Sequence, residues 1–158
     1  MEEKELIANM IQTPDGTILR SLYRHDYVRY TDTVSGEDYF TDGGTDYQRI
    51  SVNKVPAKVI SIYSDAPFEQ IREYLVRGTF EECAECKRIW VKLNCLSDEH
   101  ITNIIDYNNQ LFGAEGLVLN TKVNKYYIME QVFRKEHGIV IPEHEYQDNE
   151  IVRSITKV

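Results

Sequence analysis

The stretch Ile11-Gln12-Thr13-Pro14-Asp15-Gly16-Thr17-Ile18-Leu19 decides the fold class of this chain. Within it, Pro14 presets the backbone angle of a turn, Asp15 can bond its own backbone, and Gly16 accepts a positive φ. Apolar and β-branched residues flank the turn on both sides. The stretch therefore predicts a β-hairpin, and with it antiparallel pairing of the strands.

Further strands are predicted up to residue 63. Residues 27–31 and 37–41 are rich in β-branched and aromatic side chains, and turns at Gly36 and at Gly43-Gly44 separate them from each other and from a strand at 47–52. Residues 58–63 predict one more strand. Pro56 must precede that strand or lie at an edge, because proline has no N–H to give to a sheet.

The periodicity then changes to that of helices. Apolar residues three or four positions apart, with capping residues or glycines at the ends, predict helices over about 64–78, 97–113 and 122–136. A strand is predicted at 87–93. The chain thus predicts an α+β fold, in which an N-terminal antiparallel β-sheet of about five to six strands precedes about three helices that pack on one face of it.

Length and composition favour one globular domain. The chain has 158 residues, of which 42% are hydrophobic and 28% charged, and this size buries a core without a disulfide or metal. We predict a single domain over residues 1–158, with loosely ordered ends at 1–10 and 143–158.

Charge and hydropathy limit the classes of partner that this chain can bind. The formal net charge of −8 makes nucleic acid an unlikely partner, and no apolar run approaches the roughly 20 residues of a membrane span. The acidic N-terminus does not resemble a signal peptide, and three cysteines, an odd number, fit a reducing compartment. We therefore expect a cytoplasmic protein without a membrane partner.

A polar cluster lies between positions 24 and 53. Its members are His25, Asp26, Asp32, Asp42, Asp46 and Arg49. Carboxylates with an imidazole can bind a divalent cation or act as acid and base, and an arginine can hold a phosphate or carboxylate. However, Asp42-Gly43-Gly44 is also typical of a turn, and neighbouring strand residues point to opposite faces. The polar cluster therefore has three interpretations: a structural network, a ligand pocket or a catalytic site.

Tyrosine is abundant, with 11 residues in the chain. Tyrosines are common on half-buried strands, but they are also enriched at interfaces. Six of them fall on the predicted strand region, where they mix with arginine, histidine and aspartate. We place the binding site for a ligand or partner at Arg24, His25, Asp26, Tyr27, Asp42, Tyr47 and Arg49.

The cysteines offer a weaker candidate. Cys83 and Cys86 have the spacing of half a zinc site, which Cys95 and His100 could complete. A redox pair and two incidental thiols in a turn are the other interpretations, and the last is favoured. We therefore assign no metal and no cofactor.

Residues 24–53 also carry a resemblance. The series His25-Asp26, Asp42-Gly43-Gly44 and Arg49 resembles a family of small uncharacterised proteins common in tailed bacteriophages and prophages, over roughly residues 15–135. The resemblance implies an accessory protein that acts inside the infected bacterium. It implies no particular chemistry.

We expect a non-enzymatic binding protein of phage origin that modulates the bacterial host. It would inhibit a host or defence protein, or sequester a small signalling nucleotide, and it could form a homodimer. The sequence contains no GxGxxG, P-loop, GxSxG or HExxH motif. The alternatives are a metal-assisted hydrolase or nuclease that uses His25, Asp26 and Asp42, and a minor virion component.

Overall fold

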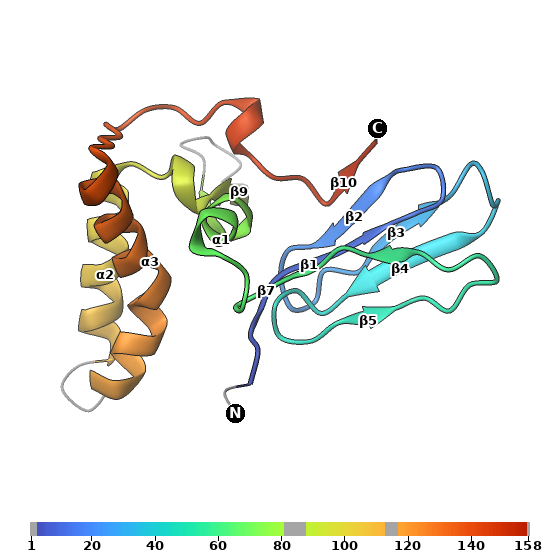
Figure 1. The fold of residues 1–158 in the computed structure, drawn as a ribbon, viewed down its shortest axis with the longest axis horizontal. Helices are drawn as coiled ribbons and strands as arrows, with labels where there is room; N and C mark the ends of the chain where they lie inside the picture. Colours follow the sequence, from blue (N-terminus) through green and yellow to red (C-terminus); the bar gives the residue numbers. More distant parts are fainter. Residues whose placement is uncertain (1–2, 81–87, 113–116, 158) are drawn as a thin grey trace.

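The computed structural model describes residues 3–80, 88–112 and 117–157 (Figure 1). It has the predicted α+β architecture, with antiparallel strands in the N-terminal part and three helices after them. In Figure 1 the two sheets of the N-terminal part lie at one end of the molecule, and α2 (Asp98–Phe112) and α3 (Leu117–His137) lie at the other. Between them lie α1 (Phe68–Tyr74) and a short hairpin.

The predicted hairpin at 11–19 is the centre of the first sheet. Strands β1 (Leu6–Gln12) and β2 (Ile18–Ser21) pair antiparallel with Ile11 opposite Leu19, and Gly16 has a φ of +93° in the turn. On its other edge β1 pairs with β6 (Lys58–Val59) and β7 (Ile62–Tyr63), while β10 (Ile155–Thr156) pairs with β2. These strands form a five-stranded antiparallel sheet.

A second sheet covers the first. It consists of β3 (Val28–Thr31), β4 (Asp38–Asp42) and β5 (Arg49–Ile50) in that order. Ile11 and Leu19 from the first sheet form a hydrophobic cluster with Val28 and Tyr39 from the second. The N-terminal strands therefore divide into two sheets that bury their inner faces against each other.

The helical part has its own core. Strands β8 (Val76–Phe80) and β9 (Arg88–Lys92) form a two-stranded hairpin, and the 3-10 helices η1 (Leu93–Cys95) and η3 (Asp148–Glu150) follow later in the chain. The core of this part consists of Val91, Leu93, Leu96, Ile101, Ile104 and Tyr127. Helix α1 ends at Tyr74 and not at Gly78 as predicted, because Leu75 is extended and residues 76–80 pair with β9.

Buried charges connect the three helices. Glu130 on α3 is fully buried and accepts two hydrogen bonds from Arg72 of α1, at 2.7 and 2.9 Å, and one from Arg134, at 2.9 Å. Arg134 also donates to Asp98 at the start of α2, at 2.8 Å. These four side chains, the ion network below, satisfy one another inside the helical part.

Residues near both ends of the described chain belong to the first sheet. Residues 7–11 are all buried in β1, a central strand that pairs with β2 on one side and with β6 and β7 on the other. At the other end, Ile155 and Thr156 pair with β2. Among the described residues, no helix is both long enough and apolar enough to cross a membrane.

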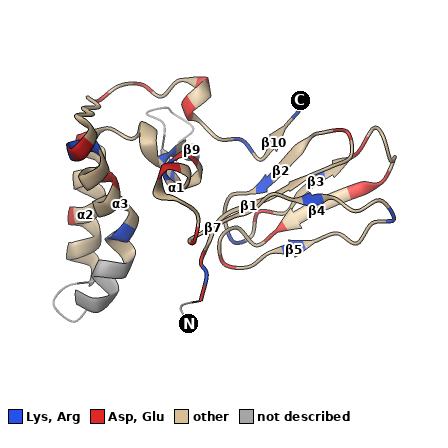
Figure 2. Ribbon diagram, in the orientation of Figure 1, with Lys and Arg blue, Asp and Glu red and all other residues tan. Residues whose placement is uncertain are grey.

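Among the described residues, the contacts that join the sheets to the helical part include two made by aromatic side chains. The ring of Tyr23 stacks on Trp90 of β9 with centroids 5.8 Å apart, and the Tyr126 hydroxyl donates to Glu5 at 3.0 Å. Figure 2 shows charged residues of both signs on both parts of the molecule.

Candidate functional site

A buried asparagine holds the turn after β4 at several points. Asn9 of β1 donates through Nδ2 to the carbonyl oxygens of Asp42, Gly44 and Tyr47, at 2.9, 3.0 and 3.3 Å. Its Oδ1 accepts hydrogen bonds from Thr41 and Gln48. The backbone between residues 41 and 48, which carries several predicted site residues, is thereby fixed to the central strand.

The two glycines of this turn are required by its geometry. Gly43 has a φ of +103° and Gly44 a φ of +56°. A Cβ atom on Gly43 would lie 2.1 Å from the carbonyl oxygen of Tyr47, and one on Gly44 would lie 2.4 Å from the backbone of Tyr23. Asp42-Gly43-Gly44 therefore forms the tight turn that its sequence predicts.

The structure commits Asp26 and Asp42 to structural contacts. The carboxylate of Asp26 accepts hydrogen bonds from the backbone N–H of Leu22 at 2.8 Å and from Ser154 at 3.2 Å. The carboxylate of Asp42 accepts from the N–H of Gly43 and from Arg49, both at 2.9 Å. His25 is exposed in the loop before β3. Within the described ranges, no three His, Cys, Asp or Glu side chains come together in a way that could hold a metal ion.

Asp32 is also a structural residue. It is 1% exposed and accepts hydrogen bonds from the backbone N–H groups of Asp15, Val34 and Ser35, at 2.8, 3.0 and 2.6 Å. Burial alone would raise the pKa of this carboxyl, but the hydrogen bonds from Ser35 and Asp15 outweigh burial and lower it. Asp32 thus joins the first hairpin to the turn between β3 and β4.

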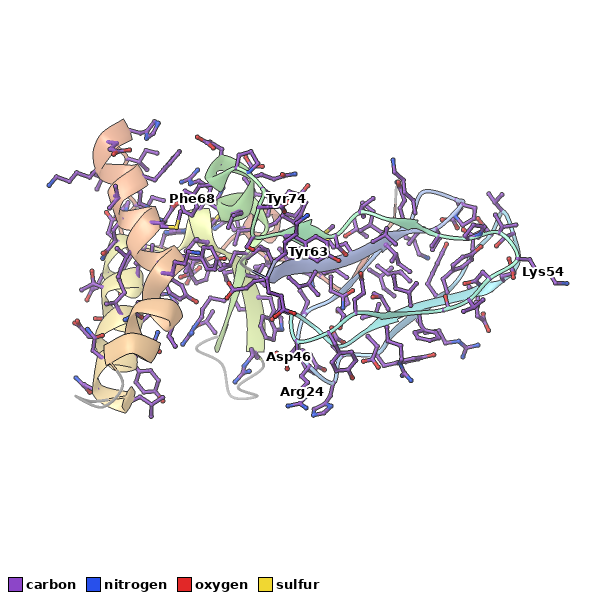
Figure 3. All side chains as sticks on the ribbon, turned by 60° about the horizontal axis from the view of Figure 1, so that its bottom comes forward. Arg24, Asp46, Lys54, Tyr63, Phe68 and Tyr74 are labelled. Carbon is purple, nitrogen blue, oxygen red and sulfur yellow. The ribbon has the colours of Figure 1, made fainter. Side chains whose placement is uncertain are left out.

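Five of the predicted site residues are exposed on the second sheet and its loops. They are Arg24, His25, Tyr27, Tyr47 and Arg49. Arg24 lies 3.7 Å from Asp46 in an exposed ion pair. Figure 3 shows these two residues together at the end of the sheets nearest the helical part, whereas Lys54 lies at the opposite tip.

An aromatic ring connects two of these exposed residues. Tyr27 packs on Phe40 with centroids 4.9 Å apart, and the guanidinium carbon of Arg49 lies 5.4 Å from the centre of the same ring. Tyr27 is 50% exposed, and the side chain of Arg49 is 62% exposed. We call Tyr27, Phe40 and Arg49 the ring–cation cluster. Its side chains present two aromatic rings, tilted by 33° to each other, with one cation, an arrangement that can stack on a partner and donate hydrogen bonds to it.

The sequence analysis did not identify Phe40 and Asn9 as site residues. The sequence nevertheless contains a feature that indicates each of these two residues. Tyr39 and Phe40 are neighbours on a strand, so one of the two rings must point outward. Asn9 is a polar residue inside the apolar run 6–11, and such a residue needs hydrogen-bond partners when buried.

The cysteine hypothesis stays a prediction, since Cys83 and Cys86 lie outside the described residues. Cys95 is partly buried, and burial raises the pKa of its thiol, with a further contribution from Glu150. The Nδ1 of His100 lies 2.8 Å from the hydroxyl of Tyr146. Burial lowers the pKa of His100, and Arg77 adds to this effect.

Comparison with known proteins adds no relative. No protein-family model matches this chain, and neither the curated proteins nor the solved structures that were compared with it give a match.

Proposed function

We propose that this chain is a non-enzymatic binding protein that contacts a partner protein through the ring–cation cluster. The observation that carries the proposal is the exposed stack of Tyr27, Phe40 and Arg49 on a sheet whose backbone is fixed. Exposed aromatic and arginine side chains on rigid elements are typical of the residues that contribute most to protein interfaces. Because Asn9 fixes the adjoining turn, little conformational entropy is lost when a partner binds.

The charge around the cluster favours a protein partner over nucleic acid. Three arginines near the cluster each have an aspartate beside them: Arg24 with Asp46, Arg29 with Asp38, and Arg49 with Asp42. A phosphate backbone would meet these carboxylates together with the arginines, and the whole chain carries −8. A mixed surface of this kind suits the polar and aromatic groups of a protein.

The carboxylates favour binding over catalysis. Asp26 and Asp42 use their oxygens to hold the backbone and Arg49, so a hydrolase mechanism would have to release them. The resemblance of residues 24–53 to small phage proteins supports a partner from the infected bacterium. A host or defence protein is the partner class that we propose, and the chain would act by occupying that protein's surface.

The test compares variants in one affinity capture from lysate of the infected host. Tyr27→Ala and Arg49→Ala remove the cluster, and Lys54→Ala at the opposite tip of the sheets is the control. Arg49→Ala should cost about 1 kcal/mol of stability or less, because the ion pair is exposed on the arginine side. We expect one protein to be recovered by the wild type and by Lys54→Ala, and lost with both cluster variants.

Equal recovery by all four proteins would contradict the proposal, as would the absence of any specific partner. A large loss of stability in Arg49→Ala would show that this residue is structural. Sedimentation of the wild type separates a homodimer from a host complex. A dimer that Tyr27→Ala dissociates would make a second copy of this chain the occupant of the surface.

A further inference from the structure

A cleft lies between the first sheet and the helical part, away from the residues of the ring–cation cluster. Its volume is about 810 Å³, within the range of roughly 300–1,000 Å³ that is common for small-molecule sites. One wall consists of β1, β2 and β10, and another of the end of α1 and the end of β9. The segment from residue 148 to residue 157 completes the lining.

Arg20 of β2 is the decisive residue of this cleft. It is 4% exposed, and its Nη2 donates to the carbonyl oxygen of Tyr74. Its Nε is buried and has no hydrogen-bond partner in the described part of the chain. No carboxylate of the described residues lies within 4.0 Å of the guanidinium, in contrast to Arg72 and Arg134 in the ion network.

A buried arginine without a carboxylate is costly to the folded state. Moving a charged group out of water is unfavourable unless an opposite charge and hydrogen bonds compensate it. Burial accordingly lowers the pKa of Arg20 to about 10. The folded chain thus buries a cation at this position, and the described residues provide no anion to pair with it.

Other cations surround the same cleft. Lys92, Arg153 and Lys157 line it, against two carboxylates, those of Glu73 and Asp148. With Arg20, the charged lining amounts to four cations and two anions. Asp148 lies 3.5 Å from Arg153, and both side chains are largely exposed. The cleft is therefore a local positive region in a chain whose net charge is −8.

We propose that this cleft binds a phosphate-bearing small molecule of about mononucleotide size, with Arg20 as the buried charge partner of the phosphate and Lys92 and Lys157 at its rim. The lining excess of two positive charges matches a dianion better than a single carboxylate. Met10, Ile18 and Ile155 offer apolar contacts to the rest of the molecule. Arginine is well suited to this role because its planar donors match phosphate oxygens.

This inference goes beyond the proposed function and does not depend on it. The cleft and the ring–cation cluster share no residue. A variant that loses ligand binding at the cleft can therefore keep an intact ring–cation cluster, and the reverse also holds.

The test is isothermal titration calorimetry of the full chain at constant ionic strength. The probes are inorganic phosphate and adenosine 5′-monophosphate, with adenosine and citrate as controls. Arg20→Leu removes the buried charge and leaves an apolar side chain, Lys92→Ala removes a rim cation, and Lys54→Ala is the control outside the cleft. We expect saturable binding of both phosphate compounds and no binding of adenosine. Lys92→Ala should weaken binding about tenfold, which corresponds to about 1.4 kcal/mol, and Arg20→Leu should abolish it.

Several outcomes would overturn the proposal. These are no binding of either phosphate compound by the wild type up to about 10 mM, equal binding of adenosine and its monophosphate, and undiminished binding by Arg20→Leu. Tighter binding of citrate than of either phosphate compound would make the ligand a polycarboxylate, against our assignment. Circular dichroism establishes whether Arg20→Leu folds. If it does not fold, Lys92→Ala and Lys157→Ala decide the question, and unchanged affinity in both contradicts the proposal.

Discussion

Replacing Glu130 by glutamine should destabilise the protein strongly, although the two side chains have nearly the same shape. Glu130 is fully buried and accepts three hydrogen bonds from two guanidinium groups. An amide provides one acceptor oxygen, and its NH₂ group would face further donors. Arg72 and Arg134 would then share a buried site without their common counter-charge.

The magnitude follows from the geometry. A hydrogen bond to a charged group contributes about 1.5–3 kcal/mol. The amide keeps at most two of the three, because two of them share the Oε2 atom, and it keeps them with a neutral acceptor. Removing one partner of a buried ion pair costs about 3–5 kcal/mol in total. Arg134 retains Asp98 and the carbonyl of Leu93, and Arg72 is 14% exposed and keeps the ring of Phe133 at 4.2 Å. We therefore expect about 3–4 kcal/mol for Glu130→Gln.

Urea unfolding at pH 7 measures this loss. Fluorescence of Trp90, the single tryptophan, reports the transition, because its ring stacks on Tyr23 at the junction of the two parts. Glu136→Gln, an exposed change on the same helix, is the matched control and should cost less than about 0.5 kcal/mol. Adding Arg72→Met to Glu130→Gln should recover part of the loss, since one unpaired cation is removed. A cost below about 1 kcal/mol for Glu130→Gln would refute the reasoning that buried charge holds the three helices together.

Three further predictions concern the sheets. Gly43→Ala should destabilise the protein by about 2–4 kcal/mol in urea unfolding, because the added Cβ meets strain at positive φ and also clashes with Tyr47. Gly36→Ala is the control and should cost about 1 kcal/mol, because its φ is also positive but nothing lies within 4 Å of the added Cβ. Equal losses of stability in the two variants would contradict the clash. Asn9→Ala should cost about 3 kcal/mol, because it leaves several buried polar groups without partners, and a change below about 1 kcal/mol would show that water replaces the amide. Hydrogen bonds from Thr17, Thr33 and Tyr30 hold the pKa of the Asp15 carboxyl well below its usual range. This depressed pKa stabilises the folded state above about pH 4, and the stabilisation is lost as the pH falls further. The stability advantage of the wild type over Asp15→Asn should therefore shrink from pH 5 to pH 2 in acid unfolding, and a constant advantage would contradict this prediction.

The parts of the fold that the sequence predicts are those set by local chemistry. The turn at Pro14–Gly16 and the glycines at 43–44 specify their backbone by residue type alone, and the structure confirms both.

The remainder depends on contacts between distant residues. The division of the strands into two sheets is decided by burial of Tyr39 against Leu19, which no local pattern contains. The strand at 76–80 overlaps the end of the stretch predicted as a helix over about 64–78, and its pairing with β9 overrides the helical periodicity there. Arg72 and Glu130 are 58 residues apart, and Arg20 is 54 residues from Tyr74, whose carbonyl it contacts, so no local pattern predicts either environment.

The candidate site divides in the same way. Residue types correctly indicated a region rich in aromatic rings and charges, but they could not show which side chains hold the backbone. Asp26 accepts a hydrogen bond from Ser154, which is 128 residues away in the sequence. Its structural role is therefore visible only in the folded chain. The role of the exposed residues of the predicted site, including Tyr27 and Arg49, stays a prediction.

The pairing of β10 with β2 has a consequence for synthesis. During translation β1 and β2 emerge early, but the outer edge of β2 finds its partner only when residues 155–156 have been made. Until then a strand with buried Leu19, Arg20 and Ser21 exposes unpaired N–H and C=O groups, the kind of edge that adds strands from other chains. The nascent sandwich is therefore most vulnerable to aggregation while the helices are still being synthesised, and a chaperone that shields this edge on the ribosome would raise the yield of native protein.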